Sequence, residues 1–84
     1  MFNQLKDLYQ LQSRAKELKK VLATKEVVGE SSGVKIIMNG SQEIKNVELN
    51  PNLDIKNQEE NLIKAFNDAL NKVQKLMAEE MMRM

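Results

Sequence analysis

The feature that most constrains the fold of this 84-residue chain is a change in the spacing of its apolar residues. As far as Ala23, leucine and alanine recur every three or four positions, which is the period of an amphipathic helix. In the middle of the chain the period falls to two, which is typical of a half-buried strand. Helical spacing then returns and continues into the C-terminal segment. The sequence therefore predicts an α+β fold with one helix before and one helix after a β segment.

The first helix is predicted over residues 3–23. Leu, Lys, Gln, Ala and Glu dominate this segment and are good helix formers, and neither Gly nor Pro interrupts it. The near-heptad spacing also permits a short coiled-coil seam, but about three heptads are too few to decide. The predicted apolar stripe consists of Leu5, Leu8, Leu11, Ala15, Leu18 and Leu22.

Three strands are predicted in the middle of the chain. The second is the clearest, because Val34, Ile36 and Met38 recur at period two. The third changes the parity of its apolar residues between Ile44 and Val47, which indicates a β-bulge or a twist. The predicted strands cover residues 25–30, 33–39 and 42–49.

Turn residues separate the predicted strands. Ser31-Ser32-Gly33 has the composition of a turn between the first two. Asn39-Gly40 predicts a tight type I′ hairpin between the second and third, because both central residues of that turn need positive φ. Pro51 ends the β segment, since proline cannot donate to a hydrogen-bonded ladder.

The second helix is predicted over residues 57–82. Asn57 followed by Glu60 resembles a capping box at its start. The element order is therefore α-β-β-β-α, with a three-stranded antiparallel sheet and two long helices in a single domain over residues 1–84. The predicted apolar stripe of this helix consists of Leu62, Phe66, Ala69, Val73 and Leu76, and it is widened by Ile63, Leu70, Met77 and Met81.

The predicted elements differ in length, and this bears on how the chain buries its apolar surface. Helices of about 30 Å extend past strands of about 20 Å or less. A chain of this size has a marginal core on its own, and without cysteine it lacks a disulfide to compensate. A second copy that extends the sheet or covers the helical stripes is the expected solution.

Composition argues against catalysis, metal binding and a membrane span. The chain has neither His nor Cys, so the commonest general base and thiolate ligands are missing. Residues 29–33 match the G-x-S-x-G pattern, but without a base they are interpreted as a turn. The carboxylates, which include the pairs Glu59/Glu60 and Glu79/Glu80, lack the spacing of a calcium loop and are interpreted as a solvated face or as helix-end charges. We therefore expect no catalytic residue, cofactor or metal, no small-molecule substrate and no membrane partner, in a cytoplasmic protein with no signal peptide.

Charge is unevenly distributed along the chain, although the net charge is only +1. Residues 1–25 are basic, residues 26–60 are acidic, and residues 61–84 are nearly balanced. Basic side chains on the first helix could contact DNA phosphates, but from charge alone a solvated helix face is the more ordinary interpretation. The basic positions singled out are Arg14, Lys16, Lys19 and Lys20, with Lys72 and Lys75 on the last helix.

The ordered set of short motifs resembles the YbaB/EbfC family of bacterial nucleoid-associated proteins. The motifs are Glu26-Val27-Val28-Gly29-Glu30, Gly33-Val34-Lys35-Ile36, Asn39-Gly40, Val47-Glu48-Leu49-Asn50-Pro51 and Ala65-Phe66-Asn67-Asp68-Ala69. This resemblance implies an intertwined homodimer whose helices project like tweezers. It also implies binding of double-stranded DNA with little or modest sequence preference, in nucleoid organisation and transcription regulation.

The resemblance also implies a set of DNA-binding residues. The basic positions on the first helix match best, and those on the last helix match less well. The alternative is a helix-mediated protein-interaction module without significant DNA binding. The two hypotheses differ in where the basic side chains point: one shared surface favours DNA, whereas scattering among acids favours the interaction module.

Overall fold

The computed structural model describes the backbone of residues 2–83 and the side chains of residues 7–83. The predicted order α-β-β-β-α with a three-stranded antiparallel sheet is confirmed. Leu5 of the predicted stripe lies outside the described side chains. The elements are α1 (Phe2–Thr24), β1 (Glu26–Ser31), β2 (Val34–Asn39), β3 (Ile44–Glu48) and α2 (Ile55–Arg83).

The tight two-residue hairpin lies between β1 and β2. Ser31 pairs with Val34, and the two residues between them, Ser32 and Gly33, have φ values of 48° and 83°. Positive φ at both central positions is the signature of a type I′ turn, whose twist matches that of the flanking strands. The interpretation of the G-x-S-x-G match as a turn therefore fits Ser32 and Gly33, whereas residues 29–31 belong to the strand β1.

The predicted tight turn at Asn39-Gly40 is wrong. Neither residue has positive φ, and β2 connects to β3 through a longer loop with positive φ at Gln42. The Asn39 N–H donates to the Glu43 carbonyl across this loop at 2.9 Å. Gly40 is required for a different reason: a Cβ there would lie 2.6 Å from the Leu22 carbonyl oxygen at the end of α1. β3 accordingly begins at Ile44 instead of residue 42.

The predicted bulge in the third strand is confirmed. Ile37 pairs with Asn46, whereas the next residue, Met38, pairs with Ile44. Lys45 is therefore the extra residue on β3. The insertion accounts for the change of parity between Ile44 and Val47, because one unpaired residue exchanges the two faces of a strand.

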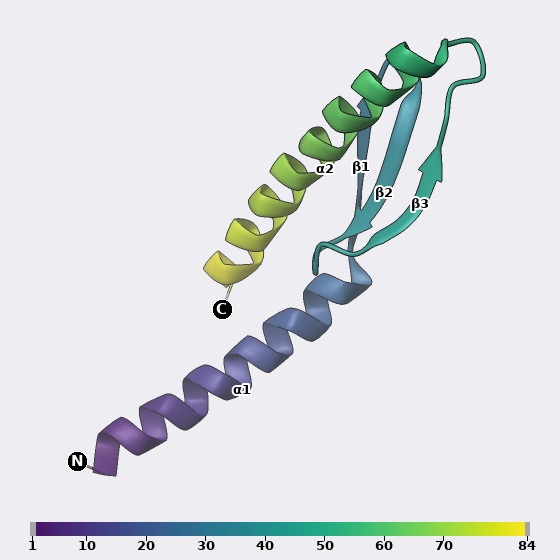
Figure 1. Cartoon of the computed structure of the whole chain (residues 1–84). Helices are drawn as coiled ribbons and strands as arrows, with labels where there is room; N and C mark the ends of the chain where they lie inside the picture. Colours follow the sequence, from purple (N-terminus) through teal and green to yellow (C-terminus); the bar gives the residue numbers. More distant parts are fainter. Residues whose placement is uncertain (1, 84) are drawn as a thin grey trace.

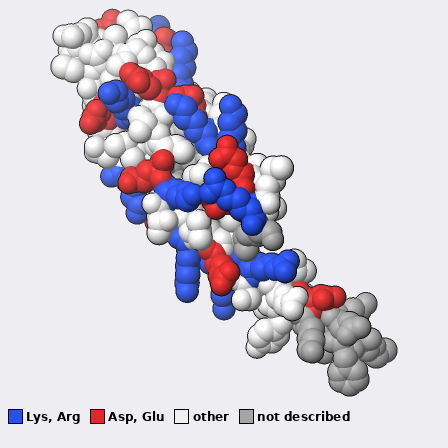
Figure 2. Space-filling view, turned by 180° about the vertical axis from the view of Figure 1, so that it is seen from behind, with Lys and Arg blue, Asp and Glu red and all other residues white. Residues whose placement is uncertain are grey.

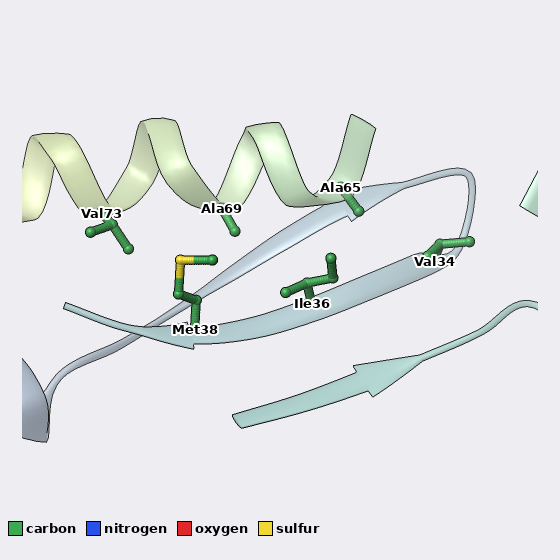
Figure 3. Packing of buried hydrophobic residues seen from close by; sticks show 6 residues of the cluster. All are labelled: Val34, Ile36, Met38, Ala65, Ala69 and Val73. Atoms are coloured by element: carbon green, nitrogen blue, oxygen red, sulfur yellow. The ribbon is translucent and has the colours of Figure 1, made fainter. Parts of the chain in front are cut away.

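α2 packs on the sheet through a stripe of small residues. Ala65, Ala69 and Val73 are fully buried and point at β2 residues such as Ile36 and Met38 (Figure 3). The backbones approach so closely that a Cβ on Gly29 of β1 would lie 2.1 Å from the Ala65 carbonyl oxygen. Glycine at position 29 and alanine at positions 65 and 69 are thus matched, and together they set the helix–sheet distance.

α2 begins at Ile55, two residues before the predicted start. The cap is Asp54, whose Oδ1 accepts the Asn57 N–H at 2.8 Å, so the predicted capping box at Asn57 is wrong. A carboxylate at this position satisfies a free helical N–H and also lies at the positive end of the helix dipole. The helix therefore begins after the charged Asp54 and not after the neutral Asn57 three residues later.

The molecule is strongly elongated, because α1 projects away from the sheet (Figure 1). Its dimensions are 62 × 18 × 17 Å, and its radius of gyration is 17.3 Å. A compact chain of this length would have a radius of gyration of about 12 Å. Leu22 in the last turn of α1 is buried, whereas Leu8 and Leu11 are 56% and 63% exposed. α1 is therefore anchored at its C-terminal end and leaves most of its apolar stripe uncovered.

Candidate nucleic-acid interface

The C-terminal end of α1 is docked on the loop between β2 and β3. The Gly40 N–H lies 2.9 Å from both the Leu22 and the Lys25 carbonyl oxygens. The Ser41 hydroxyl is 3.5 Å from the Lys19 carbonyl oxygen. These contacts fix the direction in which α1 leaves the sheet.

The side chain of Asn39 holds this loop together through hydrogen bonds. Its side chain is 1% exposed, and its Oδ1 accepts the N–H groups of Ser41 and Glu43 at 3.0 and 2.9 Å. Its Nδ2 donates to Glu43 Oε1 at 3.0 Å and approaches the Ala23 carbonyl oxygen at 3.4 Å. One buried amide thereby links the loop to the end of α1.

Three of the predicted basic residues surround one hollow beside this joint. At about 100° per residue, Lys16, Lys19 and Lys20 lie within one third of the circumference of α1. They line a hollow between α1 and the loop, together with Ala23, Ser41 and Glu43. All three lysines are exposed, and none forms a salt bridge with another side chain that the structure describes. The hollow is therefore lined by three exposed basic residues and one exposed acidic residue.

Arg14 lies on a different side of α1. Helical geometry places it about 160° from Lys16 around the axis. It lines another hollow, formed with Leu11, Ala15, Leu18 and Met81 of α2. Arg14 and the three lysines are within two turns in the sequence, but they do not share one face. The four residues form one group in the sequence because they are close together, but the helical period places Arg14 on a different side of α1 from the lysines.

Lys72 on α2 is engaged at the edge of the sheet. Its Nζ donates to the Val28 carbonyl oxygen at 2.7 Å and lies 3.1 Å from Asp68 Oδ2. The same carboxylate oxygen accepts the Glu30 N–H at 3.0 Å. The Glu30 N–H, followed by Lys72, holds the pKa of Asp68 below its usual value. Asp68 and Lys72, four residues apart on α2, thus form an ion pair that also satisfies backbone groups on the edge strand β1.

Lys75, the remaining predicted site residue, is exposed on α2. Its charge contributes to the lowered pKa of Asp68 but is the smallest of the causes. Neither Lys72 nor Lys75 lines the hollow at the end of α1. The six predicted residues therefore fall into three groups, of which only the lysines of α1 converge.

Glu80 lies near the end of α2, as the helix-end interpretation has it, but the interpretation of this carboxylate as solvated is wrong. Glu80 is 8% exposed, and its Oε1 accepts hydrogen bonds from Lys25 Nζ and, at 3.4 Å, from Arg83 Nη1. The hydrogen bond from Lys25 is the main reason why the pKa of Glu80 is lowered. The spacing Val73-Met77-Glu80 places this carboxylate on the buried stripe of α2, which is the signal that could have identified it. The ion pair links the end of α2 to the residue that joins α1 and β1.

Acidic and basic side chains are intermingled on the face of the molecule that Figure 2 shows. With a net charge of +1, long-range attraction of the whole molecule to a polyanion is small. Attraction has to come from local groups such as Lys16, Lys19 and Lys20 on α1. Within residues 2–83, no helix has the length and apolar character needed to cross a membrane.

Fold, sequence and comparison identify the class of this protein. It is an elongated α-β-β-β-α chain with clustered lysines on a projecting helix. The YbaB/EbfC DNA-binding family matches residues 1–84, and the chain belongs to that family. The predicted family membership and non-enzymatic character are confirmed by this match.

A relative of known name supports this assignment. The chain is similar to a nucleoid-associated protein of Rhodospirillum centenum, with 39% identity over 84 residues. The match covers 93% of this chain and 78% of that protein. It therefore extends over nearly all of the elements described above.

Proposed function

We propose that the protein binds double-stranded DNA mainly through phosphate contacts from α1. The observation that carries the proposal is the convergence of Lys16, Lys19 and Lys20 on one exposed hollow in a chain of this family. Ammonium groups neutralise phosphates without reading base edges, which fits binding with little sequence preference. Arg14 would add a contact on the flank of α1. Lys75 would be secondary, and Lys72 would act mainly at the sheet edge.

We propose further that the DNA-binding form is a homodimer. The apolar stripe of α1 is largely exposed, and so is the strand β3. β3 and α2 also border an apolar hollow lined by Ile36, Ile44, Val47, Leu62, Ile63 and Phe66. A second copy packed on these surfaces would bury apolar area that one chain leaves in water. It would also double the number of lysines that face DNA.

The cellular role proposed here is organisation of the nucleoid and regulation of genes in the bacterial cytoplasm. The name of the R. centenum relative supports the nucleoid assignment. Binding that depends on phosphates suits this role, because it tolerates many sequences along a chromosome.

The test is the affinity for a fluorescent DNA duplex, measured by anisotropy across a salt series. The dimeric mass is first established by sedimentation equilibrium. The expected result is a linear fall of log K with log salt, with a slope of about −0.9 for each phosphate neutralised. Absence of binding at low salt by a folded dimer would contradict DNA binding. A monomer under the same conditions would contradict the proposed assembly.

The alternative is a protein-interaction module that uses the exposed apolar surface of α1. Leu8 and Leu11 are more than half exposed, and Met81 of α2 lies beside the same stripe. If this surface binds another protein, replacing Leu11 by Asp would abolish that interaction and leave duplex affinity unchanged. If the same surface holds the dimer together, the substitution would weaken both dimerisation and duplex binding.

A further inference from the structure

Glu43 places a negative charge beside Lys16, Lys19 and Lys20 of α1. It lies in the loop between β2 and β3, and it lines the same hollow as Lys16, Lys19 and Lys20. A phosphate that approaches this hollow therefore meets a carboxylate as well as the lysines. The hollow carries three positive charges and one negative charge.

The carboxylate of Glu43 is held in place, although the residue is exposed. The nearly fully buried Asn39 donates to Glu43 Oε1 at 3.0 Å and accepts the Glu43 N–H at 2.9 Å. This hydrogen bond, followed by the charges of Lys45 and Lys19, keeps the pKa of Glu43 below its usual value. The carboxylate is thus ionised at neutral pH, and its side-chain hydrogen bond limits its movement away from the lysines.

We propose that Glu43 sets an upper limit on the affinity of the α1 lysines for DNA phosphates. This inference rests on the proposed function, since it concerns the same surface. A fixed negative charge repels the phosphate and offsets part of the attraction from the lysines. In a protein that contacts many sites along DNA, such a charge favours rapid release over tight binding at any one site.

Charge–charge energies give the size of the effect. Two unit charges a few ångströms apart in a well-hydrated site interact weakly, and salt screens them within about 10 Å at 0.1 M. Removing one such repulsion is expected to tighten duplex binding by roughly two- to threefold per protomer at low salt. The gain should shrink as the salt concentration rises.

Glu43→Gln tests the proposal with little change in shape. Glutamine retains an oxygen that can accept the Asn39 amide, so the loop is expected to fold normally, and a thermal melt verifies this. Glu48→Gln is the matched control, because Glu48 is also exposed, lies on β3, and does not line the hollow. Both variants raise the net charge of the chain by the same amount.

The expected result is tighter duplex binding by Glu43→Gln at low salt, with a smaller effect for Glu48→Gln. An equal gain in duplex affinity in both variants would mean that the effect comes from the net charge of the chain, and it would overturn the proposal. Unchanged or weaker binding by Glu43→Gln would also overturn it, and weaker binding would indicate that Glu43 positions the lysines. If wild-type protein and both variants all fail to bind at low salt, DNA binding itself is contradicted and this inference falls with it. Binding by Glu43→Gln alone would support the inference while revising the proposed affinity of the wild-type protein.

Discussion

α1 and α2 are both long amphipathic helices, yet only α2 is packed against the sheet along much of its length. The difference lies in the size of the side chains on their apolar stripes. α2 presents Ala65, Ala69 and Val73 to a strand that carries Gly29, so the two backbones approach closely. α1 presents mainly leucines and is held at its last turn, where Leu22 meets Gly40. Amphipathic spacing alone therefore predicts a helix but not its docking partner.

This contrast has a functional consequence. α2, Asp54 and the sheet form a body whose core is built within one chain. α1 extends from that body and keeps Lys16, Lys19 and Lys20, together with Leu8 and Leu11, accessible. A segment that contributes only Leu22 to the buried core of the single chain is therefore available to other molecules.

The largest expected effect comes from placing a charge on the α2 stripe. Leu70 packs against the core, and Leu70→Asp should lower the free energy of unfolding by about 3 kcal/mol or more. The same change at the exposed Leu11 of α1 should leave the fold of the protomer intact and weaken dimerisation. Urea unfolding and sedimentation equilibrium of both variants measure this difference. A normally stable dimer with Asp at position 70 would mean that the α2 stripe is not buried.

A smaller effect is expected from adding volume to the two helices. Ala69→Leu should cost about 2–3 kcal/mol, because the larger side chain has no space between α2 and Gly29. Ala15→Leu on α1 should change stability by less than about 0.5 kcal/mol, since this position is exposed. Denaturant unfolding of both variants compares the helices directly. A large loss for Ala15→Leu at concentrations too low for dimerisation would show that α1 is tightly packed within the single chain.

The ion pair that links the two helices predicts a pH dependence of stability. The pKa of Glu80 is lowered in the folded chain from its ordinary 4.5, mainly by Lys25. Its contribution is therefore complete above pH 4.5 and is lost as the pH falls through the lower, folded-state value. Glu80→Gln should have a lower melting temperature than the wild type at neutral pH, and the difference should narrow on acidification. A difference that stays constant with pH would indicate that the ionised carboxylate contributes nothing.

The smallest expected effect on the fold concerns the edge of the sheet. Lys72→Met removes the group that donates to the Val28 carbonyl and leaves that part of β1 unpaired. Edge strands with free backbone groups pair with other chains, so the variant should self-associate more at high concentration. Light scattering measures this, with Lys64→Met on α2 as a control that does not touch β1. Equal behaviour of the two variants would rule out edge protection by Lys72.

How much of this could be predicted from the sequence depends on the range over which each signal acts. Periodicity identified the helices and strands, and the parity change at Ile44 and Val47 located the bulge, because these features are local. The hairpin signal at Asn39-Gly40 failed because Gly40 meets Leu22 from a distant turn of α1. Glu80 was misjudged for the same reason, since its partner Lys25 lies 55 residues away.

The candidate site shows the same limit. Four basic residues within two turns formed one group in the sequence, whereas the helical period places Arg14 apart from the three lysines. Counting degrees around α1 would have separated them without a structure. The role of Asn39 in fixing Glu43 beside the lysines required the loop geometry, because no local pattern specifies a buried amide.

The most direct test of the central claim is the salt dependence of duplex binding by the variant in which Lys16, Lys19 and Lys20 are replaced by Ala. A variant with Ala at Lys56 and Lys64, which lie on α2 outside the hollow, is the control for lost positive charge. The account predicts weaker binding and a salt slope that is shallower by about 0.9 for each lysine that contacts a phosphate. The control should keep a slope close to that of the wild type, and both variants should remain dimeric. Unchanged affinity and slope in the α1 variant would contradict the assignment of DNA binding to α1.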